Sequence, residues 1–397
     1  MEVTVLLVGI GGYGNIYVDN LLDEHEKKGV KIVGAVDPHP EGCRRLAELE
    51  QLQIPFFETT EDFYEKHSAD LAVISTPIQF HCQQTCLALE KGSNVLCEKP
   101  ISATIQEARA MMAKEAETGR FVAVGYQWSF SDAILSLKAD VQAGVLGRPK
   151  RLKTLIFWPR NEEYYKRSWA GKQKDSQGNW ILDSVANNAT AHYLHNMFFI
   201  LGKGLLSAEP AQVTAELYRA NEIENYDTAA ARVYTTEGVE LLYFASHATE
   251  QRQNPIFTYE FEKATVTYQQ ESGEITAVFD DGRRKVYGDP FKGLCNKLWL
   301  AVDAVRDGRE IPCGLKAASS HTICINGMQE SVPEISKFPK ELLRQTGQPK
   351  QTWVQSLAEG FSSCYDNWQL PSEGGIPWAV GGREIDLRGY EFFPSRG

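Results

Sequence analysis

Cysteine is scarce in this sequence. Eight cysteines occur in 397 residues, and none lies in a Cys-x-x-Cys pair. Such sparse, unpaired cysteines exclude a disulfide scaffold, and they give no indication of a zinc finger or a thioredoxin-type redox site. Cys82 and Cys86 share one face of a predicted helix, where small buried thiols are expected. The cysteine pattern therefore predicts a reducing, cytoplasmic location.

Positive charge and long apolar runs are also lacking. Lysine and arginine total 41 against 52 acidic residues, for a formal net charge of −11. This acidic excess argues against nucleic acid or an anionic membrane as a partner. No apolar run reaches the roughly 18 residues needed to cross a bilayer. The sequence from Met1 to Val5 shows no secretion signal. The composition is that of a globular protein, and the length predicts two or three domains.

The first 126 residues alternate between apolar runs and helical patterns. Strands that alternate with helices of this length predict βαβ units and a parallel sheet, in which both faces are buried. The expected strands are Val3–Gly9, Lys31–Val36, Asp70–Thr76, Asn94–Glu98 and Phe121–Gly125. The expected helices are Tyr13–Leu22, Pro40–Gln51, Gln79–Lys91 and Thr104–Thr118.

The remainder of the chain predicts a second α/β domain over residues 127–345, with a largely antiparallel open sheet. Its helices are expected near Asp132–Ala143, Val185–Leu201, Leu294–Asp307 and Ala317–Ser331. Its strands are expected at Arg151–Trp158, Ala211–Tyr218, Ala229–Tyr234, Val239–Ala245, Phe257–Phe261, Ala264–Gln269 and Glu274–Phe279. Residues 346–397, rich in Trp, Gly and Pro, predict an irregular extension.

A glycine motif joins the first strand to the first helix. Gly9, Gly11 and Gly14 fit the Gly-x-Gly-x-x-Gly fingerprint of dinucleotide-binding domains, with Gly12 and Tyr13 between them. The glycines permit a tight turn, a close approach of the pyrophosphate and close helix–strand packing, and the helix N-terminus supplies amides to the phosphates. A purely structural turn is the alternative reading.

The cofactor choice is predicted by the end of the second strand. Asp37 lies 23 residues after Gly14, at the spacing of the acid that binds a ribose diol. Because a carboxylate repels a 2′-phosphate, NAD is favoured over NADP. Arg44 or Arg45 could soften this preference by reaching back, although exposed arginines are usually solvated.

Cys97-Glu98-Lys99-Pro100 follows a short strand at the carboxyl edge of the sheet, where open α/β folds bind ligands. A lysine there can hydrogen-bond a substrate hydroxyl and transfer its proton. With Thr76-Pro77 and His81 upstream, this motif resembles the glucose–fructose oxidoreductase/inositol dehydrogenase (Gfo/Idh/MocA) family. The resemblance implies a Rossmann domain followed by an open-sheet domain, a catalytic Lys99, and a cofactor site that includes Thr76, Pro77, His81, Glu98, Lys99 and Gln127.

A second stretch that the family resemblance interprets runs from Asn188 to His195. The family pattern Asp-x-Gly-x-His-x-x-Asp places His192 on the catalytic histidine, while Asn188, Thr190 and His195 depart from it. Asn188 lies one helical turn before His192, so the two side chains can share a face. An asparagine can orient a hydroxyl but cannot accept its proton, so proton transfer is expected to rest on His192 and Lys99.

No metal is expected. His192 and His195 lie three residues apart and Asp183 is nearby in sequence, but a zinc site needs three or four ligands in a defined geometry and no third ligand is placed. His195 remains open between a substrate-binding role and helix packing.

Aromatic and basic residues alternate between Trp158 and Lys172. Aromatic planes stack on the apolar face of a sugar or cyclitol, and arginines donate to hydroxyls or carboxylates. The expected substrate-binding residues are Arg160, Tyr164, Arg167, Trp169, Lys172 and His195. A packed loop is the alternative for each.

These observations predict an NAD-dependent oxidoreductase of a sugar, cyclitol or related polyol, with Lys99, His192 and Asn188 in the catalytic site. Two alternatives stay open: an NAD-dependent glycoside hydrolase that oxidises its substrate transiently, and a non-catalytic ligand-sensing protein. The apolar strand Val239–Ala245 predicts an uncovered sheet face that a second copy buries, in a homodimer or homotetramer.

Overall fold

The computed structural model describes residues 1–269 and 273–395, which form two compact units. The N-terminal unit comprises Met1–Ser102, Gln106–Phe130 and Gly293–Ser319. The C-terminal unit comprises Ala103–Ile105, Ser131–Lys292 and the residues from Ser320 onward. Residues 396–397 of the predicted extension lie outside the described residues.

A parallel sheet forms the centre of the N-terminal unit, with strand order β3-β2-β1-β4-β5-β6. The strands are β1 (Val3–Val8), β2 (Val30–Val36), β3 (Phe56–Phe57), β4 (Leu71–Ile74), β5 (Asn94–Cys97) and β6 (Val122–Val124). The order reverses between β1 and β4, which is the switch point where such sheets bind ligands at their carboxyl edge. The predicted Rossmann-type sheet is confirmed.

Helices join these strands. They are α1 (Gly14–Glu24), η1 (Pro40–Gly42), α2 (Leu46–Gln51), α3 (Thr60–Tyr64), α4 (Ile78–Glu90), α5 (Ile105–Thr118) and η2 (Gln127–Phe130). The helix expected over Pro40–Gln51 is interrupted between η1 and α2. Asn15 explains the break, because its side chain donates to Gly42 O at 3.1 Å and accepts from Arg44 N at 2.7 Å. Backbone groups bonded to Asn15 in this way do not complete a continuous helix.

The boundary predicted at residue 126 does not account for a later return of the chain. Helix α9 (Asn296–Asp307) packs against β1, β4 and β5 of the N-terminal unit. Helix α10 (Leu315–Ser331) then begins in that unit and continues into the C-terminal unit. Residues 293–319, predicted within the second domain, therefore belong to the first.

A larger sheet forms the C-terminal unit, with the order β14-β13-β12-β11-β7-β10-β9-β8-β15 and β18 beside β8. Neighbouring strands are antiparallel except for the pairs β7–β10 and β8–β15. The strands are β7 (Pro149–Phe157), β8 (Pro210–Arg219), β9 (Thr228–Thr235), β10 (Glu240–Ser246), β11 (Gln253–Phe261), β12 (Ala264–Tyr268), β13 (Ile275–Phe279), β14 (Arg284–Gly288), β15 (Ser336–Lys337) and β18 (Ile385–Asp386). The largely antiparallel sheet is confirmed.

The remaining elements of this unit include several that the sequence did not predict. Its other elements are α6 (Asp132–Gln142), α7 (Glu162–Tyr165), η3 (Val185–Ala189), α8 (Ala191–Leu201), η4 (Lys340–Leu342), β16 (Leu343–Thr346), β17 (Gln351–Val354) and α11 (Leu357–Asn367). The expected helix over Val185–Leu201 is divided into the π-helical η3 and α8. The expected irregular extension contains the hairpin β16–β17 and helix α11.

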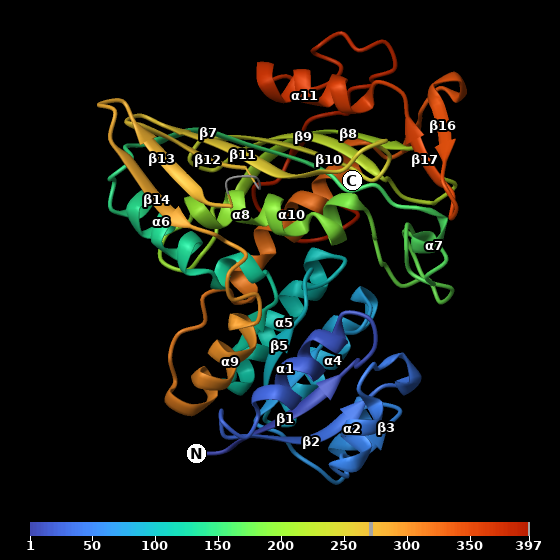
Figure 1. Cartoon of the computed structure of the whole chain (residues 1–397), viewed down its shortest axis with the longest axis vertical. Helices are drawn as coiled ribbons and strands as arrows, with labels where there is room; N and C mark the ends of the chain where they lie inside the picture. The colour runs from blue at the N-terminus through green and yellow to red at the C-terminus, as the bar shows by residue number, and fades with distance from the viewer. Residues whose placement is uncertain (270–272, 396–397) are drawn as a thin grey trace. The chain divides into compact units, whose positions relative to one another are not determined.

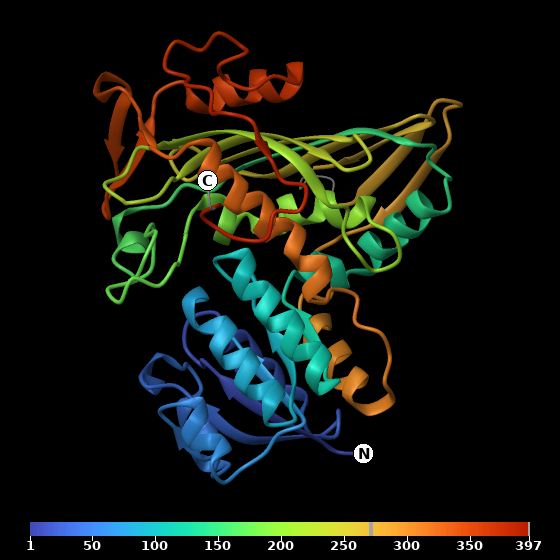
Figure 2. The same ribbon diagram turned by 180° about the vertical axis from the view of Figure 1, so that it is seen from behind.

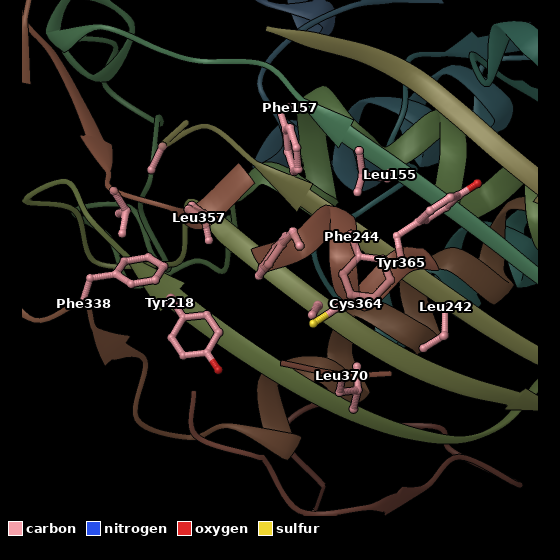
Figure 3. Packing of buried hydrophobic residues seen from close by; sticks show 14 residues of the cluster. Leu155, Phe157, Tyr218, Leu242, Phe244, Phe338, Leu357, Cys364, Tyr365 and Leu370 are labelled. Carbon is pink, nitrogen blue, oxygen red and sulfur yellow. The ribbon is translucent and has the colours of Figure 1, made fainter. Parts of the chain in front are cut away.

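Part of one sheet face, over β7 to β10, is covered by the segment 357–378, here named the C-terminal cap. Figures 1 and 2 show α11 over this face and α8 and α10 over the other. Figure 3 shows Leu155, Phe157 and Phe244 of the sheet packed with Leu357 and other cap side chains. The premise that this face is bare is therefore wrong, because β10 is buried by the chain itself.

Charged sheet residues also hold the cap. Lys153 donates to Tyr365 O at 2.6 Å near the C-terminal end of α11. Glu216, fully buried, accepts from Ser372 Oγ at 2.6 Å, and Arg232 donates to Trp368 O at 3.0 Å. Hydrogen bonds to charged groups stabilise more than neutral ones, so the face is matched specifically to the cap.

Candidate functional site

The glycine loop has the geometry that its sequence predicts. Gly9 lies directly after β1 and has φ +81°, a conformation that favours glycine. A Cβ atom on Gly14 would lie 2.1 Å from Gly9 O, so no larger residue fits there. Gly11 and Gly12 complete the loop, and Tyr13 directly precedes α1 and is 38% exposed. The loop and the α1 N-terminus form a backbone cradle of the kind that binds a pyrophosphate.

Asp37 lies beside this loop at the end of β2. Its Oδ2 accepts hydrogen bonds from Ile10 N at 2.9 Å and Gly11 N at 3.3 Å, which place the carboxylate against the cradle. Arg44 pairs with Asp19 at 2.6 Å, and Arg45 pairs with Asp23 and with Glu48 at 2.6 Å each. Because both arginines are paired with other carboxylates, the uncompensated charge at this strand end is negative.

The loops after β4 and β5 are joined by His81. Its Nδ1 lies 2.8 Å from Pro100 O and its Nε2 lies 2.8 Å from Thr76 O, and the side chain is 1% exposed. Pro77 directly precedes α4, and Thr76 Oγ1 donates to Gln84 at 2.6 Å. Both ring nitrogens of His81 therefore hold the two loops together, and its place at the cofactor stays a prediction.

Glu98 is buried in the interior of the N-terminal unit with a lysine that the motif analysis missed. Lys297 of α9 forms an ion pair with Glu98 and donates to Tyr13 Oη at 3.1 Å. Tyr17 Oη donates to Glu98 at 2.5 Å. Burial raises the pKa of Glu98, but Lys297 and Lys99 outweigh it and the net pKa lies below its usual value. Glu98 and Lys297 are therefore an ionised pair.

Lys99 follows this pair at the carboxyl edge of the sheet. Its backbone N donates to Glu98 Oε2 at 3.1 Å, and the residue is half-buried. A Cβ on Gly125 would lie 2.6 Å from Glu98 Oε1, so the end of β6 must carry glycine for Glu98 to take this position. Gln127, in η2, is also half-buried within this unit. Glu98 thus fixes the backbone of Lys99, while its own side chain is buried from solvent.

In the C-terminal unit, α8 positions His192 and η3 positions Asn188. Asn188 Nδ2 donates to Asp183 Oδ1 at 2.9 Å, and Gly171 N donates to Asp183 Oδ2 at 2.6 Å. Asp183 is 2% exposed, and its N donates to Lys172 O at 3.0 Å. The motif has no acid at position 188, but the carboxylate of Asp183 lies beside Asn188. The wider turn of the π-helical η3 brings the two side chains together.

The aromatic and basic residues of the segment after β7 come together. Tyr164 and Trp169 meet edge to face with ring centroids 6.1 Å apart. The guanidinium groups of Arg160 and Arg167 lie 4.8 and 4.9 Å from the Tyr164 ring centroid. Four of the predicted substrate-binding residues therefore form one cluster.

His195 does not join that cluster. It is 1% exposed on α8 and stacks on Phe199 with ring centroids 5.8 Å apart. Burial lowers its pKa well below the usual value, and His321 and Lys138 act in the same direction. The structure thus packs His195 within the core against Phe199, and its substrate-binding role stays a prediction.

Comparison with known proteins assigns the N-terminal unit. Residues 3–126 match the model of an oxidoreductase family with an NAD-binding Rossmann fold. This part of the chain is therefore an NAD-binding domain of the oxidoreductase class. Over these residues the chain is similar to the Gfo/Idh/MocA family, as the Glu-Lys-Pro motif predicts.

Curated relatives match over the same region. The scyllo-inositol 2-dehydrogenase (NAD(+)) of Bacillus subtilis is 28% identical over 151 residues, which cover 37% of this chain and 42% of the relative. The inositol 2-dehydrogenase of Rubrobacter xylanophilus is 27% identical over 163 residues, covering 41% and 45%. The chain thus matches less than half the length of these relatives.

Solved structures share the fold of nearly the whole chain. The WlbA dehydrogenase of Bordetella pertussis, solved with NADH and UDP-GlcNAcA, aligns with TM-score 0.68 and 20% identity over 84% of this chain and 97% of that protein. An oxidoreductase of Agrobacterium radiobacter, solved with NAD+, L-tartaric acid and magnesium, aligns with TM-score 0.67 and 16% identity, again over 84% and 97%. No helix in the described part of this chain has the length and apolar character to span a membrane.

Proposed function

We propose that this protein is an NAD-dependent oxidoreductase that transfers a hydride between the nicotinamide and a carbinol carbon of a sugar, cyclitol or related polyol. The observation that carries the proposal is the position of Lys99 at the carboxyl edge of an NAD-binding sheet, where Glu98 fixes its backbone. The relatives named as inositol dehydrogenases support the substrate class.

The residues of the N-terminal unit fit the cofactor. Cβ atoms on Gly9 and Gly14 would lie 3.0 Å from Ser75 C and 2.1 Å from Gly9 O, so only glycine permits this tight loop, and amides at the α1 N-terminus suit the pyrophosphate. Asp37 suits the ribose diol of NAD and repels a 2′-phosphate. When bound, the nicotinamide supplies or accepts the hydride.

Lys99 holds the substrate oxygen in this mechanism. An ammonium beside the reacting hydroxyl donates a hydrogen bond to the oxygen and stabilises negative charge that develops on it during oxidation. The Glu98–Lys297 pair fixes the strand end from which Lys99 extends. Lys99 therefore needs no large rearrangement to act.

His192 moves the proton. An imidazole titrates near neutrality, so it can accept the hydroxyl proton during oxidation and return it during reduction. Asn188 orients the substrate hydroxyl, and Asp183 fixes the Asn188 amide because its Oδ1 accepts from Nδ2. With Nδ2 held in this way, the amide oxygen of Asn188 is its remaining acceptor for a substrate hydroxyl.

The protein is proposed to act in the cytoplasm. None of the eight cysteines forms a disulfide, as expected of a reducing compartment. A homodimer or homotetramer stays a prediction, but the C-terminal cap covers the sheet face on which it was based.

The test is NADH formation at 340 nm with a panel of inositols, aldoses and sugar acids. Net NADH that accumulates with substrate oxidation supports the proposal. Cleavage of an aryl glycoside without net NADH would instead indicate the glycoside hydrolase, and NAD and sugar binding without either reaction would indicate a sensing protein.

A further inference from the structure

Three arginines in the C-terminal unit lie on aromatic rings without the acidic partners that several other arginines of this unit have. Arg148 and Arg151 each pair with a glutamate within 2.7 Å. Among the described residues, Arg160, Arg167 and Arg252 pair with no carboxylate and lie on aromatic rings instead. We name these three the arginine cluster. Three guanidinium groups close together without carboxylate partners favour the binding of an anion.

The arginine cluster is held together by its aromatic neighbours. Tyr164 carries the guanidinium groups of Arg160 and Arg167 at 4.8 and 4.9 Å from its ring centroid. Arg252 lies 5.1 Å from the Trp158 ring centroid, and its Nε donates to Asn254 Oδ1 at 2.8 Å. Burial lowers the pKa of Arg160, and Arg252 and Arg167 also lower it, because the three positive charges lie near one another.

Buried polar atoms without partners lie in the same place. Arg160 Nε, Tyr165 Oη and His247 Nε2 are buried and have no hydrogen-bond partner among the described residues. His247 is 2% exposed, and its ring centroid lies 5.8 Å from that of Tyr164. Buried polar atoms without hydrogen-bond partners cost free energy unless a ligand satisfies them. Their coincidence with the arginine cluster is a second, independent indication of a ligand.

The tautomer of His247 adds a detail about that ligand. Its Nδ1 lies 2.7 Å from Trp158 O, which can only accept, so Nδ1 carries the proton. Burial lowers the pKa of His247 to about 3, and Arg160 acts in the same direction, so the ring is neutral and Nε2 is an acceptor. The arginines thus offer donors to an anion, while His247 offers an acceptor to an adjacent hydroxyl.

The arginine cluster connects to the proposed catalytic histidine within one unit. Trp158, on which Arg252 lies, meets Tyr193 edge to face with ring centroids 5.6 Å apart. Tyr193 directly follows His192 on α8, and their ring centroids are 6.4 Å apart. Trp158 and Tyr193 therefore connect Arg252 of the arginine cluster to His192 through successive ring contacts.

We propose that Arg160 and Arg167 bind an anionic group of the substrate, so that the substrate is a sugar acid or a sugar phosphate and not a neutral polyol. That the bound anion is the substrate rests on the proposed function, whereas the existence of the anion-binding site does not. The shared chemistry is a carboxylate or phosphate next to a hydroxyl. Arg252 supplies a third positive charge.

The test is calorimetric titration of the full-length protein with D-glucuronate, D-glucose 6-phosphate and D-glucose, with and without NAD. We expect at least one anion to bind ten times or more tighter than glucose, and the stronger of the two anions identifies carboxylate or phosphate. Arg167→Met and Arg160→Met should weaken that anion at least tenfold. Arg167 is exposed, so its variant keeps the fold, and Arg148→Met, exposed and paired with Glu262 outside the arginine cluster, is the matched control.

Failure of this inference is distinguishable from failure of the proposed function. If neither anion binds more tightly than glucose, or if Arg167→Met changes nothing, the anion site is overturned even when NAD binds and neutral polyols are oxidised. If an anion binds without NAD and depends on Arg167 while NAD itself does not bind, the site stands and the oxidoreductase proposal fails.

Discussion

Lys297 and Glu98 form a buried ion pair although 199 residues separate them in the chain. The lysine comes from α9, which the chain adds to the N-terminal unit after completing most of the larger sheet. The pair therefore ties a late segment to the strand end that carries Lys99. A buried charge keeps its ionised form only with such a partner.

Removal of one member of this pair should be strongly destabilising. Lys297→Met leaves Glu98 without its counter-ion, and a buried charge left alone costs about 3–5 kcal/mol. Urea unfolding, followed by circular dichroism, should show this loss. The double variant Glu98→Gln with Lys297→Met should recover part of it, because neither charge remains. Equal losses in the single and double variants would contradict a direct pairing.

The same pair predicts a pH dependence. The pKa of Glu98 lies below its usual value in the folded state, so its stabilisation is complete above the unfolded pKa of about 4.3 and is lost as pH falls through the folded value. The pKa of Lys297 is raised, so its contribution is lost only as pH rises through that raised value. Glu98→Gln should therefore flatten the stability profile below about pH 4.3. An unchanged acid limb in Glu98→Gln would count against the ionised pair.

NAD should bind more tightly than NADP. Asp37 would meet a 2′-phosphate with like charge, and Arg44 and Arg45 are paired with other acids. We expect at least about a tenfold difference, or ~1.4 kcal/mol, by calorimetric titration. Asp37→Ser should reduce this difference in affinity between NAD and NADP. Tighter binding of NADP by the wild-type protein would show that an arginine leaves its carboxylate to bind the phosphate.

Asn188→Asp should destabilise the fold at neutral pH. The new carboxylate would lie against Asp183, which accepts from Asn188 Nδ2 at 2.9 Å. Loss of that hydrogen bond, together with repulsion between the two carboxylates, should lower the free energy of unfolding by about 1–3 kcal/mol. This loss of stability should become smaller as the pH drops and one of the acids takes a proton. Thermal unfolding from pH 5 to 8 measures this. A variant as stable as the wild type at pH 8 would show that the two side chains part without cost.

The C-terminal cap should contribute strongly to stability. Phe361 is fully buried in the cap and meets Phe157 and Phe244 of the sheet. Phe361→Ala should cost about 3–5 kcal/mol of unfolding free energy. Phe392→Ala is the control, because that ring is 40% exposed and its loss should matter little. Equal effects of the two variants would mean that the cap is not firmly held.

Much of the N-terminal unit could be predicted from sequence because its information is local. Apolar strands, the glycine loop and Asp37 are close together in the chain and occupy the expected positions. The role of Lys297 was not predicted, because a single lysine on a helix is usually a surface charge and its partner Glu98 is distant in sequence. Asp183 was considered only as a metal ligand, and its contact with Asn188 was missed because the motif was read with ordinary helical spacing, whereas η3 is π-helical.

The C-terminal cap was not predicted from the sequence for a related reason. Its sequence, rich in Trp, Gly and Pro, carries little periodicity, and the apolar strand Val239–Ala245 was read as needing a second copy. Burial depends on what packs above a strand, and that is a contact across more than 100 residues that no local pattern encodes. The separation of Phe244 from Phe361 in the chain illustrates the limit.

The most direct test of the account is the effect of Lys99→Met on turnover and on cofactor binding together. With a confirmed substrate, kcat should fall by about 10²-fold or more, the scale of a lost acid–base group, while the Kd for NAD changes less than about threefold. Unchanged turnover in Lys99→Met, with NAD still bound, would contradict the assignment of Lys99 to the chemistry.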